Sequence, residues 1–128
     1  MTYEIPPAGI TMEEYISETM IKMGIPVHLK GYHYLRTSIL MTAEDMSLVS
    51  SVTKLLYPEV AKIYGTTSQK VERAIRNAIE ISWERGSTDL FEKFYGYSIK
   101  QGRKRPTNSE YIANIADYVQ LVFRYVKN

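Results

Sequence analysis

Four long polar side chains recur at helical spacing near the middle of the chain: Gln69, Glu72, Arg73 and Arg76. Because they stand at i, i+3, i+4 and i+7, a helix would carry all four on one side of its first two turns. Such side chains suit base edges in the major groove, where Arg bonds guanine, Gln bonds adenine and Glu accepts from cytosine. The spacing is equally typical of a solvated helix face with an ion pair between Glu72 and Arg76.

The residues before this face have the features of a helix-turn-helix motif, which favours the DNA-binding interpretation. Gly65 stands where a turn between helices requires a positive φ, and the hydroxyl residues 66–68 can cap the helix that follows. We expect a short helix from Pro58 to about Tyr64 and a recognition helix from about Ser68 to Arg85. The motif then spans about 58–85, and the N-terminal residues of its second helix would enter the major groove.

The rest of the chain predicts an all-α domain of about six helices. Thr11-x-x-Glu14 and Thr107-x-x-Glu110 are capping boxes, so a helix should begin at each. Between 47 and 56 we expect a helix with the following residues turned inward: Val49, Val52, Leu55 and Leu56. We expect a tail or linker remnant at 1–10 and a single helical domain at 11–128.

Composition and charge restrict the class of protein. The 128 residues include no cysteine, no apolar run long enough to cross a membrane and no visible signal peptide, which fits a cytoplasmic protein without contact with a membrane. Net charge is +2, but residues 1–64 hold five Lys and Arg against seven Asp and Glu, whereas 65–128 hold eleven against seven. The basic excess therefore lies in the half with the proposed recognition helix, as phosphate binding requires.

Basic and polar residues around the motif are candidates for the DNA backbone. The segment 100–105 can be a solvated loop or a phosphate clamp, and its position after a helix-turn-helix favours the clamp. Lys30 and Arg36 can reach a phosphate or stay solvated, and solvated side chains are the commoner case. The predicted backbone or flanking contacts are Lys62, Thr67, Ser68, Lys70, Asn77, Arg103, Lys104 and Arg105.

Three separated blocks of sequence resemble one known family. The blocks GIPVHLKGYHYLR, SSVTKLLYPEVAKIYGTTSQKVERAIRNAIE and RPTNSEYIANIAD are similar to the C-terminal DNA-binding domain of the master sporulation response regulator of endospore-forming bacteria, from about Gly24 to about Asp117. The resemblance implies a two-component transcription regulator of sporulation initiation that reads a TGTCGAA-like box, often in tandem copies. Within KVERAIR, Glu72, Arg73 and Arg76 match the groove-facing positions of the family.

The resemblance also implies partners. Residues 86–97 correspond to the region of the family that meets the σ subunit of RNA polymerase, here with Asp89, Glu92 and Lys93 exposed, although the local sequence departs from the family pattern. Tandem boxes imply self-association on DNA. The family carries a receiver domain before this one, so we expect this chain to be the isolated effector domain.

Two other classes of function are alternatives to DNA binding. A helical protein-interaction module would use the charged face to dock an acidic partner and would not bind DNA. An enzyme would need a nucleophile with a base, a phosphate loop or paired carboxylates, and none of these patterns is present. His28 and His33 are five residues apart, which is not the spacing of two ligands on one helix face, so we predict no metal, no cofactor and no catalysis.

Overall fold

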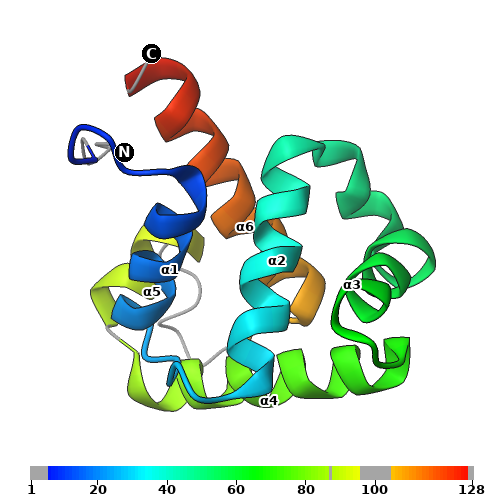
Figure 1. The fold of residues 1–128 in the computed structure, drawn as a ribbon. Helices are drawn as coiled ribbons and strands as arrows, with labels where there is room; N and C mark the ends of the chain where they lie inside the picture. Colours follow the sequence, from blue (N-terminus) through cyan, green and yellow to red (C-terminus); the bar gives the residue numbers. More distant parts are fainter. Residues whose placement is uncertain (1–5, 87, 96–104, 127–128) are drawn as a thin grey trace.

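A computed structural model describes residues 6–86, 88–95 and 105–126, and every secondary-structure element in these ranges is helical (Figure 1). The predicted all-α class is therefore confirmed. The α-helices are α1 Met12–Lys22, α2 Lys30–Glu44, α3 Tyr57–Tyr64, α4 Ser68–Arg85, α5 Thr88–Tyr95 and α6 Asn108–Leu121. A 3-10 helix at Met46–Ser51 (η1) and π-helices at Val52–Leu56 (η2) and Val122–Val126 (η4) complete the fold.

Both predicted capping boxes are present. The Thr11 hydroxyl accepts from the Glu14 amide at 3.0 Å, and the Glu14 carboxylate accepts from the Thr11 amide at 3.1 Å. Thr107 and Glu110 make the same reciprocal pair at 3.1 and 2.9 Å. Because each box satisfies amides that the helix itself leaves unpaired, α1 and α6 begin where the sequence predicts.

The helix α2 lies at the centre of the molecule and packs against α1, α4 and α6 (Figure 1). Its inward stripe meets apolar residues of the other helices in one continuous core, which buries the side chains of Leu35, Ile39, Ile75, Ile79, Ile112 and Ile115. The helix α4 runs across one end of this core, so its inner side is held by packing while its outer side faces solvent.

The segment 47–56 differs from the predicted regular helix. It forms a 3-10 helix followed by a π-helix, in which the Tyr57 amide donates to the Val52 carbonyl five residues earlier. The wider π turn rotates successive side chains away from α-helical positions. Val52 and Leu56 are buried, but Leu55 is 54 % exposed, so its predicted inward position is wrong.

One buried polar cluster joins three parts of the fold. Ser82 Oγ donates to the carbonyl of Met23 at 2.6 Å and lies 2.8 Å from Tyr111 Oη. Because the serine has one hydrogen, Tyr111 must be the donor in the second bond. The cluster connects the end of α1, the second half of α4 and the first turn of α6. Burial raises the pKa of Tyr111, so its hydroxyl keeps its proton.

Candidate nucleic-acid interface

The two helices of the predicted motif are joined by a short turn with the expected local chemistry. Pro58 lies in the first turn of α3, which ends at Gly65 with φ +65°. The amide of Thr66 donates back to the Ala61 carbonyl at 2.9 Å, and the Thr67 hydroxyl accepts from the Lys70 amide at 3.2 Å. The turn therefore closes one helix and caps the next.

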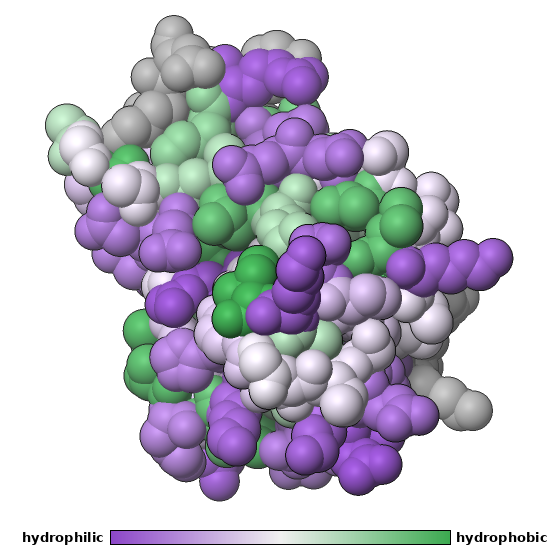
Figure 2. Space-filling model, turned by 45° about the vertical axis from the view of Figure 1, so that its right-hand side comes forward, coloured by the Kyte–Doolittle hydropathy of each residue, from purple (hydrophilic) through white to green (hydrophobic). Residues whose placement is uncertain are grey.

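The second helix has the predicted bounds, and one of its faces is buried. Its buried residues are Val71, Ile75, Ala78, Ile79 and Ser82. Since this side packs into the core, the rotation of α4 about its axis is set and the opposite side is presented outward. The edge of the molecule along α4 is mainly hydrophilic in the space-filling view (Figure 2).

The outer face carries the four predicted base-contacting side chains. Gln69, Arg73 and Arg76 are exposed, and Glu72 is partly exposed. Arg76 Nη1 donates to Glu72 Oε1 at 2.7 Å, so the ion pair of the solvated-face interpretation is present. Arg73 lies on the same face and forms no ion pair with any described residue.

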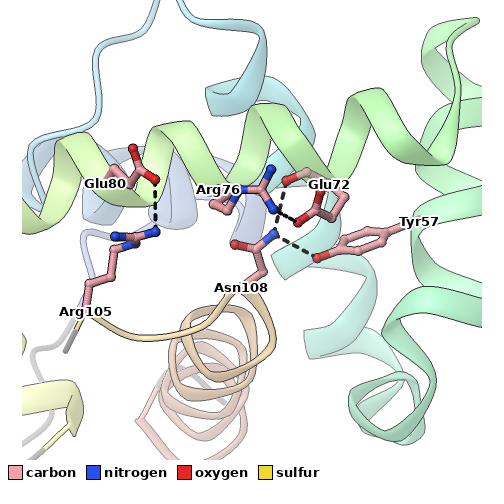
Figure 3. A network of polar contacts seen from close by, with 6 residues as sticks. All are labelled: Tyr57, Glu72, Arg76, Glu80, Arg105 and Asn108. Carbon is pink, nitrogen blue, oxygen red and sulfur yellow. Dashed lines mark hydrogen bonds and ion pairs between the residues drawn. The ribbon is translucent and has the colours of Figure 1, made fainter.

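The start of α6 borders this face on one side (Figure 3). Asn108 Nδ2 donates to Tyr57 Oη at 3.0 Å and to the backbone carbonyl of Glu72 at 3.1 Å. Arg105 Nη2 lies 3.0 Å from Glu80 Oε1. An open groove of about 710 Å³ lies between α4 and the start of α6, and its lining includes Tyr57, Glu72, Arg105 and Asn108. One amide thereby connects α3, α4 and α6 beside the outer face.

A second groove borders the opposite side of α4. It has a volume of about 670 Å³, and its cationic lining residues are Lys30, Lys70 and Arg73, with Asn77 beside them. Arg76 lines the first groove and Arg73 lines the second. The outer face of α4 is therefore a ridge with a groove along each flank.

The structure describes most of the predicted flanking residues. Lys62, Lys70 and Asn77 are exposed, whereas Thr67 is engaged as the cap of α4. Ser68 is partly buried, Arg105 pairs with Glu80, and Arg36 is partly buried against the Tyr32 ring. Arg103 and Lys104 lie outside the described residues. Of the described candidates, the exposed side chains that neither cap a helix nor form an ion pair are therefore Lys62, Lys70 and Asn77.

The residues assigned by resemblance to a polymerase contact lie on α5. Asp89 is exposed, and Glu92 and Lys93 are partly exposed. Lys93 Nζ lies 4.7 Å from the centre of the Tyr118 ring, which is the geometry of a cation–π contact. In Figure 1, α5 lies away from α3 and the start of α4.

Two residues of the site, Tyr57 and Asn108, were not among the sequence-based candidates. Tyr57 is buried at the start of α3, and burial raises its pKa. Asn108 lies 51 residues from Tyr57 and 36 residues from Glu72 in the chain. The capping box at Thr107 places Asn108 at the start of a helix, but no local pattern indicates what it contacts.

Among the residues that the structure describes, the surroundings of the two histidines do not resemble a metal site. His28 is exposed, and His33 packs edge-on against the Tyr32 ring at 5.2 Å. No group of three or more His, Cys, Asp or Glu residues within the described ranges has the arrangement of a metal site. None of the helices described is long and apolar enough to cross a membrane.

Comparison with known families gives one match that covers most of the chain. The model of the family described as "Sporulation initiation factor Spo0A C terminal" matches residues 16–119. The matched range begins within α1 and ends within α6, so it includes both helices of the motif, both grooves and Asn108.

Proposed function

Because the chain belongs to the Spo0A C-terminal family of sporulation initiation factors, we propose that it is a DNA-binding effector domain that reads duplex DNA with α4 in the major groove. The observation that carries this proposal is the ridge of α4, with Arg73 and Arg76 exposed between two grooves and the inner side locked in the core. An α-helix fits the major groove in width, so its outward side chains meet base edges.

The base contacts follow from the chemistry of the ridge. Arg73 and Arg76 each present a guanidinium fork that matches O6 and N7 of guanine, and Gln69 suits adenine. Glu72 has two roles open to it: it accepts from a cytosine amino group, or it orients Arg76. The 2.7 Å ion pair favours the orienting role in the free protein. We propose that the sequence read is a TGTCGAA-like box.

The flanking residues hold the phosphates. Lys62 is exposed on α3, Lys70 and Asn77 are exposed on α4, and Arg105 joins Arg103 and Lys104 in a basic segment before α6. The Arg105–Glu80 pair is nearly half exposed on both sides. Such a pair contributes about 0–1 kcal/mol, so a phosphate can replace the carboxylate at small cost. Thr67 and Ser68 add the start of α4 to this set.

The wider role we propose is regulation of sporulation genes by activation or repression in a two-component pathway. Asp89, Glu92 and Lys93 on α5 would contact the σ subunit of RNA polymerase, away from the face that holds DNA. Two copies of the domain would associate on tandem boxes.

The experiment that tests the proposal is fluorescence anisotropy with a labelled duplex carrying the box and a scrambled duplex of equal composition. We expect tighter binding to the box, with affinity for both duplexes falling as salt rises. Equal affinity for the two duplexes would contradict base reading. If neither duplex binds, the chain is the protein-interaction module that its charged face also permits.

A further inference from the structure

The groove lined by Lys30, Lys70 and Arg73 includes one cation, Lys30, from outside the predicted helix-turn-helix. We propose that it holds the phosphodiester backbone of one DNA strand, with Lys30 of α2 as a phosphate contact outside the helix-turn-helix. This inference rests on the proposed function. It assigns to Lys30 a role that its sequence context alone did not favour.

Close packing brings α2 to this position. A Cβ atom on Gly31 would lie 2.2 Å from the carbonyl oxygen of Ala74 and 3.0 Å from the Cβ of Ala78. The start of α2 therefore touches the backbone of α4, and only glycine fits there. Lys30 precedes this contact by one residue, so it is held at the flank of the recognition helix, where it lines the groove with Lys70 and Arg73.

The two grooves differ in whether their cations are paired with carboxylates. In the groove beside α6, Arg76 pairs with Glu72 and Arg105 pairs with Glu80. In the groove beside α2, the described lining residues include no carboxylate, and the three cations form no ion pair with any residue that the structure describes. Cations gathered without a counter-charge repel each other, so an anion placed among them gains from all of them.

The start of α2 adds to the same field. The helix begins at Lys30 with no side-chain cap and no acidic residue in its first turn. A helix N-terminus carries partial positive charge, which an acidic residue commonly offsets. Here the first residue of the helix, Lys30, is itself a cation, so it adds to the positive charge at the helix start and strengthens the attraction for an anion.

The geometry of the major groove explains why a phosphate strand would lie there. A helix inserted in the groove has one sugar–phosphate backbone along each flank, because the groove is about as wide as the helix with its side chains. Arg105 marks the flank of α4 on the α6 side, and Lys30 marks the opposite flank. The two strands would then be held by different parts of the chain.

The test is the Lys30→Gln variant, measured by anisotropy on the box and scrambled duplexes at about 50 and about 200 mM salt. One lost phosphate contact lowers the salt slope by about 0.9. When salt rises fourfold, the affinity of wild type should therefore fall by a factor about 3 times larger than the factor by which the affinity of the variant falls. At the lower salt, the variant should bind both duplexes several-fold more weakly than wild type does. The ratio of its affinities for the two duplexes should not change, because a phosphate contact does not depend on base sequence.

Two controls accompany this variant. Arg124→Gln removes an exposed positive charge in η4, which lies at the end of the molecule opposite α4 (Figure 1), and should leave the salt slope as in wild type. Lys30→Arg keeps the charge and should restore the slope. Thermal unfolding of Lys30→Gln should match wild type, since the side chain is exposed.

The outcomes separate this inference from the proposed function. If wild type prefers the box but Lys30→Gln keeps the wild-type slope, the groove is not a phosphate site and the function stands. A loss confined to the box duplex would show that Lys30 acts on base reading and would overturn the inference. Absence of binding by wild type to either duplex would overturn both.

Discussion

Arg76 on the outer face of α4 donates a 2.7 Å hydrogen bond to the carboxylate of Glu72, one turn earlier on the same helix. The Arg76 side chain is 47 % exposed and the Glu72 side chain is 37 % exposed. An exposed pair at this spacing stabilises a helix by only about 0.3–0.5 kcal/mol. Its larger effect is on the orientation of Arg76, because the carboxylate holds the guanidinium along the ridge of α4.

We therefore expect Glu72→Ala to affect recognition more than stability. The midpoint of thermal unfolding should stay close to wild type, since about 0.5 kcal/mol is lost at most. Preference for the box over a duplex with one altered guanine should fall, because Arg76 is no longer oriented. Glu84→Ala, an exposed carboxylate near the end of α4, is the matched control and should keep the preference. Loss of preference in both variants would indicate a general charge effect.

Arg73→Ala should separate base reading from phosphate binding. A bidentate contact to guanine contributes about 1–3 kcal/mol of discrimination. Affinity for the box should therefore fall by about 5- to 150-fold, with a much smaller change on scrambled DNA. Lys104→Ala should instead weaken binding to both duplexes alike. Equal losses on both duplexes in the two variants would contradict the assignment of Arg73.

Asn108→Ala tests the amide that joins three helices. The change removes hydrogen bonds to Tyr57 Oη and to the Glu72 carbonyl, both in a partly buried environment, and it leaves the Tyr57 hydroxyl without its Asn108 donor. We expect the free energy of unfolding to fall by about 0.5–1.5 kcal/mol for each hydrogen bond lost. Chemical denaturation of the single variants and of the double variant with Tyr57→Phe forms a cycle.

The cycle has a definite expected sign. Tyr57→Phe should cost less in the Asn108→Ala background than in wild type, because the hydroxyl has already lost this partner. Strict additivity of the two changes would show that the hydrogen bond between them carries no energy. Box preference should also fall in Asn108→Ala, since Asn108 braces α4 at Glu72, the residue that orients Arg76.

Local chemistry explains which parts of the fold were predictable. The caps at Thr11 and Thr107, a cap from one of residues 66–68 and the turn at Gly65 depend on residues within one helical turn, and all four are confirmed, with Thr67 as the capping residue of α4. The bounds of α4 follow from Thr67 and from Gly86 at its end. Signals of this range are readable because both partners of each contact stand close together in the chain.

The remaining features depend on contacts between distant segments. The exposure of Leu55 follows from a π-helix, for which the apolar spacing carries no signal. Asn108 meets Glu72 across 36 residues, and Arg105 meets Glu80 only once α6 has docked on α4. The close approach of Gly31 to α4 likewise depends on how the helices pack. The sequence alone could therefore not predict either groove.

The buried hydroxyl of Tyr111 makes stability depend on pH in the alkaline range. Burial raises its pKa, so the folded state keeps the proton after the unfolded chain, with an ordinary value of about 10, has lost it. The stabilisation is fully present below pH ~10 and is lost as pH rises toward the folded-state pKa. Stability should thus fall by up to about 1.4 kcal/mol per pH unit for this group.

Urea denaturation between about pH 9 and about pH 11, on either side of the ordinary tyrosine pKa, measures this slope. Tyr111→Phe should be less stable than wild type at the lower pH, because Ser82 loses its donor, yet its stability should fall less steeply as pH rises. Tyr57→Phe should flatten the slope in the same direction, since burial also raises the pKa of Tyr57. An unchanged slope in Tyr111→Phe would mean that the hydroxyl ionises in the folded protein as readily as in the unfolded chain. The cluster with Ser82 and Met23 would then have to be open to solvent, contrary to its burial between α1, α4 and α6.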